Sequence, residues 1–473
     1  MNILQITFAG FGSLLFRFIN KDKHKEKVIF IANIFFLFLL QPATSLRSLN
    51  IILPWGTLLL IVAVGMAVCE TISRKEAFQV LIFSILGFLP FLFSEFIPAL
   101  KTTTLDKNLN QNILGAFLLV SGCVMAVLYF LKRKNKYLTF FLVLILVIFV
   151  VLKQPQISYL ASEGWRTLFQ QNTELASNLD IRWIGYSYIA FRMIHVIREY
   201  QKQRFHEISL IRLMNFCLFF PTLTAGPIAK YDDFSNQMDK PVNTAESSLL
   251  EGGKRLFLGL FKKFVLADSL AIVALSSIHA EQITSSGWMW LSLILYSFQI
   301  FFDFSGYTDI AIGLGLFLGI RLPENFNKPY LKSNLTKFWD SWHITLSQWI
   351  RAYFFNPVNR SLRKSNLAKS TNLILFITQV ATMAIIGLWH GITWTFLIWG
   401  LWHGIGLFFQ NRWSAFVKSR FNKIRANRTL DMIMNGASTL LTFLYVSLGW
   451  VWFLSPTIHD AGTIFLKLVG KGF

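Results

Sequence analysis

Residues 370–411 of the chain read STNLILFITQVATMAIIGLWHGITWTFLIWGLWHGIGLFFQN and contain no Asp, Glu, Lys or Arg. A helix needs about 20 mostly apolar residues to cross the hydrocarbon core of a bilayer. These residues are numerous enough for two such helices, joined by a tight turn near Gly391, Ile392 and Thr393. The pattern therefore predicts membrane-spanning helices here.

Similar apolar windows recur along the chain. Windows without a charged side chain cover residues 28–46, 48–69, 77–94, 108–131, 282–302 and 432–459. Only 15% of the 473 residues are charged, against roughly 25% in soluble proteins. We expect an all-α polytopic membrane protein with about eleven transmembrane helices plus re-entrant or interfacial helices. Residues 1–16 are expected to be a retained first helix and not a signal peptide, because the basic residues follow the apolar stretch and no small-residue cleavage site is evident.

The net charge of +21 would fit a nucleic-acid-binding protein, but the basic residues have a different distribution. Lys and Arg concentrate in short clusters between apolar windows, at residues 17–27, 74–75, 132–136 and 198–204. The positive-inside rule places these loops in the cytoplasm and the N-terminus outside. Membrane topology and anionic lipid head groups explain the charge, so no nucleic-acid partner is expected. Three cysteines in apolar stretches, Cys69, Cys123 and Cys217, rule out a disulfide framework and a Cys-based zinc module.

The chain divides into three predicted regions by the polarity of its apolar windows. Residues 1–180 have almost no ionisable group inside them and are expected to be transmembrane scaffold helices. In residues 181–411, acids, amides, histidines and glycines lie within or beside apolar helices, where a charge costs about 2.5–3.5 kcal/mol at the bilayer centre. Such residues persist where they face protein or a water-filled cavity, so residues 181–411 are the predicted functional core. Residues 412–473 are a C-terminal transmembrane region.

One candidate group lies in residues 299–315, QIFFDFSGYTDIAIGLG. Asp303 or Ser305 is expected to cap a helix that begins here, with Asp309 in its first turns near the positive end of the dipole. These three residues are candidate substrate-binding groups, and purely structural carboxylates are the alternative. Further upstream, two prolines in residues 220–228, FPTLTAGPI, break any helix, and this segment either lines a cavity or forms a surface loop.

A second group lies in residues 325–330, NFNKPY, and 338–351, FWDSWHITLSQWIR. Its candidate binding residues are Asn325, Asn327, Trp339, Trp342 and Ser347, together with His343. The spacing of four places Trp339, His343 and Ser347 on one face of a helix. An amphipathic helix at the membrane interface is the alternative.

The third group is the motif Gly-Leu-Trp-His-Gly, which occurs at residues 387–391 and again at 400–404. Its histidines, His390 and His403, are the titratable side chains of this charge-free window. A neutral imidazole tolerates burial and can accept a proton near pH 7. A buried structural histidine is the alternative, and the residues alone do not separate His390 from His403. Together with His343 they show no zinc-ligand pattern, so no metal is expected.

These motifs, together with GYSYIAF (185–191) and GLFKKFVLAD (259–268), stand in the order found in a known family. Residues 181–411 resemble the membrane-bound O-acyltransferases, in the bacterial branch of the alginate O-acetylation and teichoic acid D-alanyl transfer proteins. The resemblance implies a ring of membrane helices around a central funnel. It also implies that His390, beside Trp389, is the catalytic histidine and that His343 is the family's second characteristic histidine. The chain departs from the family at Ala352, where an aspartate is common.

The family resemblance implies transfer of an acyl group, expected to be acetyl, from a cytoplasmic thioester to a hydroxyl acceptor. The donor would be acyl-coenzyme A or an acyl-carrier protein, with no tightly bound cofactor. The acceptor would be an exported cell-surface polysaccharide, reached through an extracytoplasmic transferase partner, and the protein would lie in the bacterial cytoplasmic (inner) membrane as a multi-pass protein. Lipid or protein acylation is the alternative within the family.

Two alternatives come from other classes of protein. A proton-coupled transporter could use Asp268, Asp303, Asp309 and the histidines as a path across the membrane. A scaffold for an export complex would need the fold but not His390. Residues 356–369 are expected to be a basic loop that contacts an anionic donor, although the positive-inside rule explains its charge equally well.

Overall fold

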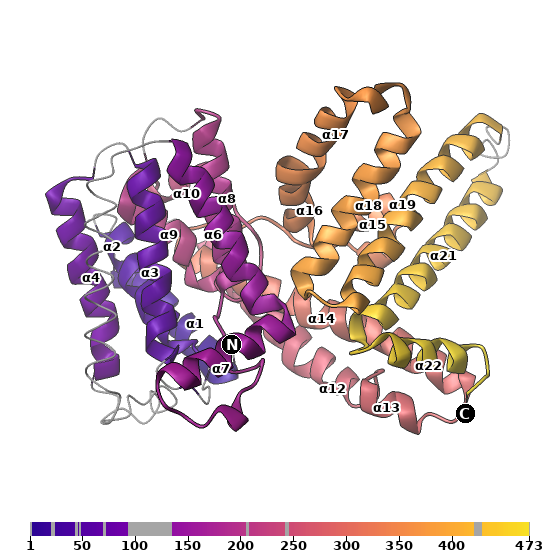
Figure 1. Ribbon diagram of the computed structural model, residues 1–473, viewed down its shortest axis with the longest axis horizontal. Helices are drawn as coiled ribbons and strands as arrows, with labels where there is room; N and C mark the ends of the chain where they lie inside the picture. Colours follow the sequence, from indigo (N-terminus) through magenta and orange to yellow (C-terminus); the bar gives the residue numbers. More distant parts are fainter. Residues whose placement is uncertain are drawn as a thin grey trace. The chain divides into compact units, whose positions relative to one another are not determined.

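The computed structural model describes residues 2–19, 24–42, 46, 49–69, 72–92, 135–204, 208–241, 246–420 and 428–472. These residues are helical and contain no β-strand beyond one isolated bridge, which confirms the all-α class for the described part of the chain (Figure 1). The chain forms two compact units. The first comprises Met1–Leu256 with Ala311–Leu322, and the second Phe257–Ile310 with Pro323–Phe473. The two units are defined by contacts between residues in the structure. The division into residues 1–180, 181–411 and 412–473, which was made from the polarity of the sequence, stays a prediction.

The first unit holds the helices of the N-terminal half. They are α1 (Ile3–Ile19), α2 (Lys25–Leu39), α3 (Leu49–Val68), α4 (Arg74–Leu92), α6 (Asn135–Lys153), α7 (Pro155–Leu168), η2 (Thr173–Leu175), α8 (Tyr186–Gln201), α9 (Leu210–Leu218), η3 (Phe220–Thr222), α10 (Tyr231–Met238) and most of α11 (Glu246–Leu260). The predicted break at residues 220–228 is confirmed, because the chain leaves helical geometry after η3. The buried guanidinium of Arg192 fixes this break by donating to the carbonyls of Cys217 (2.9 Å) and Thr222 (2.8 Å).

The two thiols that the structure describes in the first unit are buried. Cys69 is 2% exposed and Cys217 is 0% exposed. Cys123 lies outside the described residues. Cys69 and Cys217 are therefore packing residues of the first unit.

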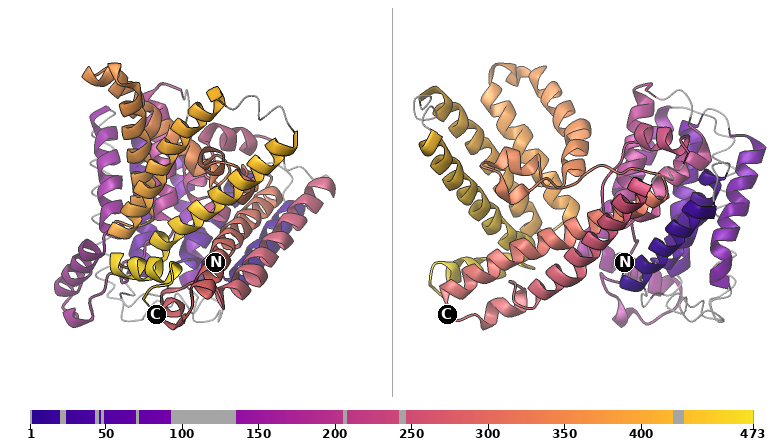
Figure 2. Two further views of the ribbon diagram at one scale, coloured as in Figure 1. Left: turned by 90° about the vertical axis from the view of Figure 1, so that its right-hand side faces the viewer. Right: turned by 180° about the vertical axis from the view of Figure 1, so that it is seen from behind.

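The second unit holds the C-terminal half. Its elements are η4 (Phe261–Ala267), α12 (Asp268–Ala271), α13 (Ser277–Gln282), α14 (Ser286–Phe317, which continues into the first unit), η5 (Pro329–Leu331), α15 (Leu335–Trp339), α16 (Ile344–Ile350), η6 (Arg351–Phe355), α17 (Asn356–Arg363), η7 (Asn366–Lys369), α18 (Thr371–His390), α19 (Trp394–Arg420), α21 (Arg428–Leu454) and α22 (Ile458–Leu468). α18 and α19 form the predicted antiparallel hairpin, with its turn at residues 391–393 (Figure 2). The two backbones approach closely at Gly404, where a Cβ would lie 2.7 Å from Val380 Cα.

The expected helix start near Asp303 is wrong, because α14 runs unbroken from Ser286 to Phe317. Asp303 and Ser305 are therefore interior residues of α14 and not caps. This stretch has no proline to end a helix, and its glycines serve close packing instead. A Cβ on Gly306 would lie 2.8 Å from the backbone nitrogen of Lys263 in η4.

Two further expectations about local structure are wrong. Trp339, His343 and Ser347 do not share one helix face, because α15 ends at Trp339 and α16 begins at Ile344. His343 between them has φ +46°, which is left-handed and interrupts any right-handed helix. Residues 356–369 are also not a loop, since α17 and η7 occupy them.

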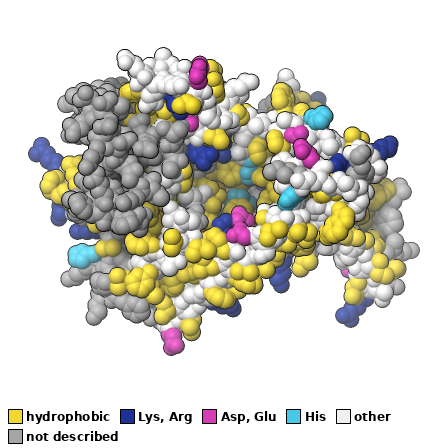
Figure 3. Space-filling model, turned by 90° about the horizontal axis from the view of Figure 1, so that it is seen from below, with side chains coloured by type: hydrophobic (Ala, Val, Ile, Leu, Met, Phe, Trp, Pro, Cys, Tyr) yellow, Lys and Arg dark blue, Asp and Glu magenta, His cyan; other side chains and the backbone are white. Residues whose placement is uncertain are grey.

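Three described helices are long and apolar enough to cross a membrane: α14, α18 and α21. A fourth crossing is possible at α6 and α7, which bend by 92°. Large hydrophobic side chains such as Phe140, Val143 and Leu441 are exposed, and hydrophobic side chains cover much of the face seen in Figure 3. A lipid environment accounts for such exposure. The window 108–131 lies outside the described residues, and the number of about eleven helices stays a prediction.

Candidate functional site

Two antiparallel pieces of chain hold His343 in the second unit. The backbone N–H of Asn327 donates to the carbonyl of Ser341 (3.0 Å), and that of Ile344 donates to the carbonyl of Asn325 (3.0 Å). Phe326 and Trp342 form an antiparallel bridge between these two bonds. This short ladder brings the motifs NFNKPY and SWHIT together, although they are separate in the sequence.

The side chain of Asn325 completes this arrangement. Its Oδ1 accepts from the backbone nitrogen of Thr345 (3.1 Å) and from Thr345 Oγ1 (2.7 Å). Asn325 is 0% exposed. The side chain therefore fixes the first turn of α16, directly after the left-handed His343, whose conformation costs about 1–3 kcal/mol for a residue other than glycine.

The imidazole of His343 is buried against aromatic rings. Its centroid lies 4.7 Å from that of Phe304 in α14 and 6.0 Å from that of Trp389 in α18. Neither ring nitrogen has a hydrogen-bond partner among the described residues. His343 lies outside the candidate spans, and burial lowers its pKa below the ordinary value for histidine. The ring is therefore neutral and retains both a donor and an acceptor.

His390 ends α18, and the centroid of its ring lies 4.5 Å from that of Trp389. The imidazole also contacts Phe453 of α21 (4.8 Å) and Trp399 of α19 (5.5 Å). His390 is half-buried, whereas His343 is 3% exposed. The rings of His343 and His390 thus both lie against the ring of Trp389.

His403 of α19 has different surroundings. It is 0% exposed, and its ring lies 5.0 Å from Trp399 and 5.1 Å from Trp339. Neither of its ring nitrogens has a hydrogen-bond partner in the described part of the chain. The second copy of Gly-Leu-Trp-His-Gly therefore places its histidine inside the helix packing of α19 and α21, which the residues alone could not reveal.

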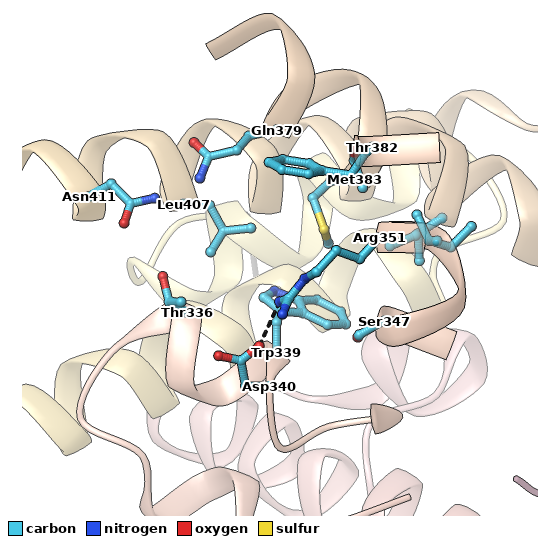
Figure 4. A pocket seen from close by; sticks show the side chains of 13 residues that line it. Thr336, Trp339, Asp340, Ser347, Arg351, Gln379, Thr382, Met383, Leu407 and Asn411 are labelled. Atoms are coloured by element: carbon cyan, nitrogen blue, oxygen red, sulfur yellow. Dashed lines mark hydrogen bonds and ion pairs between the residues drawn. The ribbon is translucent and has the colours of Figure 1, made fainter. Parts of the chain in front are cut away.

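A cavity of about 150 Å³ lies beside the predicted binding residues Trp339 and Ser347. α15, α16, α18 and α19 line it (Figure 4). Asp340 and Arg351 form an ion pair of 2.7 Å there, drawn as a dashed line. Trp339 Nε1 and Gln379 Oε1 are buried without a hydrogen-bond partner among the described residues. Both side chains line the cavity, together with polar residues such as Ser347 and Asn411.

Other predicted site residues lie apart from this cavity. Trp342 is buried in the aromatic packing around Trp450, at 5.2 Å, and Asn327 is exposed. Asp309 is buried and forms an ion pair of 2.6 Å with Lys262, whereas Asp303 is half-exposed and pairs with Lys263. Ser305 is buried in α14, and its hydroxyl has no hydrogen-bond partner in the described residues.

Comparison with known proteins identifies the family of the chain. The family model described as "MBOAT, membrane-bound O-acyltransferase family" matches residues 80–454. The chain belongs to the membrane-bound O-acyltransferase family.

Similar proteins place the chain in one branch of the membrane-bound O-acyltransferases. It is 38% identical over 290 residues (61% of this chain, 52% of the relative) to the probable alginate O-acetylase AlgI of Pseudomonas syringae pv. tomato. It is 37% identical over 269 residues (55% and 48%) to the peptidoglycan O-acetyltransferase of Helicobacter pylori. It is 30% identical over 277 residues (57% and 66%) to the teichoic acid D-alanyltransferase of Streptococcus thermophilus. The matched part spans about half the length of the first of these relatives.

Some residues of this O-acyltransferase site were not selected from the sequence. Lys262 and Lys263 neutralise Asp309 and Asp303, and their only signal was a pair of basic residues inside the apolar motif GLFKKFVLAD. Phe453, which contacts His390, comes from a distant helix and had no sequence signal. In the described part of the chain, no three His, Cys, Asp or Glu side chains lie together in a way that could hold a metal ion.

Proposed function

We propose that the protein is an O-acyltransferase that moves an acyl group, acetyl in the first instance, from a thioester donor to a hydroxyl acceptor. The observation that carries the proposal is the contact of both His343 and His390 with the ring of Trp389. Two histidines beside one aromatic ring can supply a base and a hydrogen-bonding group for acyl transfer.

His390 is the general base in this proposal. Its imidazole takes the proton of the acceptor hydroxyl while the oxygen attacks the thioester carbonyl, a role worth roughly 10²–10⁴ in rate. The new C–O bond forms, the C–S bond breaks, and the departing thiolate takes up the proton held by His390. The neutral ring of His343 donates a hydrogen bond to the oxyanion that develops on the carbonyl.

The donor and acceptor follow from chemistry and from the relatives. We infer a thioester of coenzyme A or of an acyl-carrier protein as donor, delivered from the cytoplasm. An exported cell-surface polysaccharide is the inferred final acceptor, because relatives are named for alginate and peptidoglycan O-acetylation. An extracytoplasmic transferase partner would complete the delivery.

We also propose the finer architecture that such a reaction needs. About eleven transmembrane helices would form a ring around a central funnel in the bacterial cytoplasmic membrane, so that donor and acceptor meet from opposite sides. Ser305, Asn327, Trp339, Trp342, Ser347 and Trp389 are proposed to contact the substrate, whereas Asn325 is fully buried. The ion pairs of Asp303 and Asp309 with lysines favour structural roles for these two carboxylates over a transport path.

Mass spectrometry of O-acyl groups on cell-surface polysaccharide tests the proposal. We would compare cells that carry the wild-type protein, His390→Ala, His403→Ala or no protein, at equal membrane levels of each variant. We expect His390→Ala to match the cells without protein. His403→Ala is the matched control, since it removes the same side chain from the second copy of the motif, and it should keep acylation.

Other results would overturn parts of this proposal. Full acylation with His390→Ala would remove the base from the mechanism. Full acylation in cells without the protein would remove polysaccharide as the acceptor, and acyl label in lipid extracts would then support a lipid acceptor.

A further inference from the structure

We propose that Asn325 is a positioning residue, which holds His343 in the orientation that acyl transfer requires. The inference rests on the proposed function, in which His343 contacts the reacting carbonyl. Asn325 does not reach the substrate itself. It acts through the backbone of the residues that follow His343.

Three hydrogen bonds connect Asn325 to the start of α16. Its carbonyl oxygen accepts from the backbone of Ile344 (3.0 Å), and its Oδ1 accepts twice from Thr345, at 3.1 Å and 2.7 Å. A helix start leaves backbone N–H groups without partners inside the helix. Asn325 satisfies two of these groups from another part of the chain, where a capping side chain normally does so.

The residue at the capping position of α16 is His343 itself. Its side chain makes no capping hydrogen bond, and its backbone is left-handed, with φ +46°. Because Asn325 takes over the capping task, the imidazole of His343 can point toward Phe304 and Trp389 and keep both ring nitrogens available. Asn325 caps α16, and the imidazole of His343 is left for the reaction. This division of tasks is the reason for assigning a positioning role to Asn325.

The amide nitrogen of Asn325 supports the same assignment. Nδ2 is buried and has no hydrogen-bond partner among the described residues, whereas Oδ1 accepts two hydrogen bonds. The acceptor oxygen therefore carries the interaction with α16. Asn325→Asp keeps that acceptor, and Asn325→Leu removes it at similar volume.

The first experiment measures the position of His343 without an activity assay. Membranes are treated with diethyl pyrocarbonate, which modifies accessible imidazoles, and the peptide of residues 338–351, in which His343 is the single histidine, is analysed by mass spectrometry. We expect little modification in the wild-type protein and in Asn325→Asp, and at least a several-fold increase in Asn325→Leu. His403, which is also fully buried, serves as the internal control and should stay unmodified.

The second experiment measures the initial rate of polysaccharide acylation at equal membrane levels. We expect Asn325→Leu to lower the rate roughly a hundredfold, as a displaced catalytic group does, and Asn325→Asp to restore most of it. The double variant Asn325→Leu/His343→Ala should be no slower than His343→Ala alone, because residues that act through one group are not additive. Thr345→Val, which loses one of the bonds to Asn325, should lie between Asn325→Leu and the wild type.

Asn33→Leu is the matched control for loss of a buried asparagine. Asn33 and Phe220 both belong to the first unit; Asn33 is 0% exposed, and its Oδ1 accepts from the backbone nitrogen of Phe220 (2.9 Å). Asn33→Leu should change the rate by the same factor in the wild-type protein and in the His343→Ala variant. The positioning role is overturned if Asn325→Leu leaves His343 unmodified, if His403 is modified to the same extent, or if its effect on rate adds fully to that of His343→Ala. A wild-type protein without acylation would overturn the proposed function instead, and the modification experiment would still decide whether Asn325 holds His343.

Discussion

Gly449 of α21 leaves room for the buried imidazole of His403. A Cβ at this position would lie 2.7 Å from His403 Nε2 and 3.3 Å from Trp402 Cδ1. Both rings belong to α19, which packs against α21, so neither can move away freely. We expect Gly449→Ala to lower the free energy of unfolding by about 1–3 kcal/mol through overpacking, measured as a lower Tm of the detergent-solubilised protein.

Gly436 provides the matched control on the same helix. Apart from its chain neighbours and the nearby backbone of its own helix, no atom lies within 4 Å of the Cβ that an alanine would add there. Gly436→Ala should leave Tm unchanged or raise it slightly, since alanine is the better helix former by about 1 kcal/mol. An equal loss of stability in both variants would mean that the packing against His403 is not the cause.

At the scale of the element, α14 carries two aspartates with different surroundings. Asp309 is buried and bound to Lys262, whereas Asp303 is half-exposed and bound to Lys263. Asp309→Asn leaves the Lys262 ammonium without this carboxylate, and we expect a loss of about 3 kcal/mol in the free energy of unfolding. Asp303→Asn, the matched change at the more exposed of the two carboxylates, should cost at most about 1 kcal/mol. Thermal unfolding of both variants decides the point, and equal losses would contradict this ranking.

Elements differ in how far the sequence predicted them. The α18–α19 hairpin was predictable because an unbroken apolar window is divided by a single Gly-Ile-Thr step. The continuity of α14 was not, because glycines such as Gly306 that pack against another backbone look the same in a sequence as glycines that end a helix. The left-handed conformation of His343 was also hidden, since hydrogen bonds from the distant segment at Asn325 support it.

The candidate site, too, was predicted only in part from the sequence. His343 and His390 were selected from their motifs, and the structure places both beside Trp389. Phe453 and Lys262, which surround or neutralise the selected residues, come from other elements. Tertiary contacts of this kind leave no periodic pattern in a single sequence.

At the scale of the whole molecule, the orientation in the membrane can be measured with cysteine labelling. The basic residues near Lys364 predict that this end of α18 faces the cytoplasm. His459, which follows α21, would then lie outside, and both side chains are exposed. We expect an impermeant maleimide to label His459→Cys in intact spheroplasts and Lys364→Cys only after lysis.

The parent protein with its own cysteines supplies the background for this labelling. Labelling of Lys364→Cys in intact spheroplasts, with His459→Cys protected, would reverse the assigned orientation. Labelling of neither variant after lysis would contradict the exposure of these two positions.

The burial of Cys69 and Cys217 affects how much of the acyl donor is lost to side reactions with the protein. A thiolate at an accessible cysteine attacks a thioester readily, and the acyl group is then lost to the protein itself. Cys69 and Cys217 are both shielded inside the first unit. Across the part of the chain that the structure describes, a thioester donor therefore meets no exposed thiol that could accept its acyl group before a hydroxyl does.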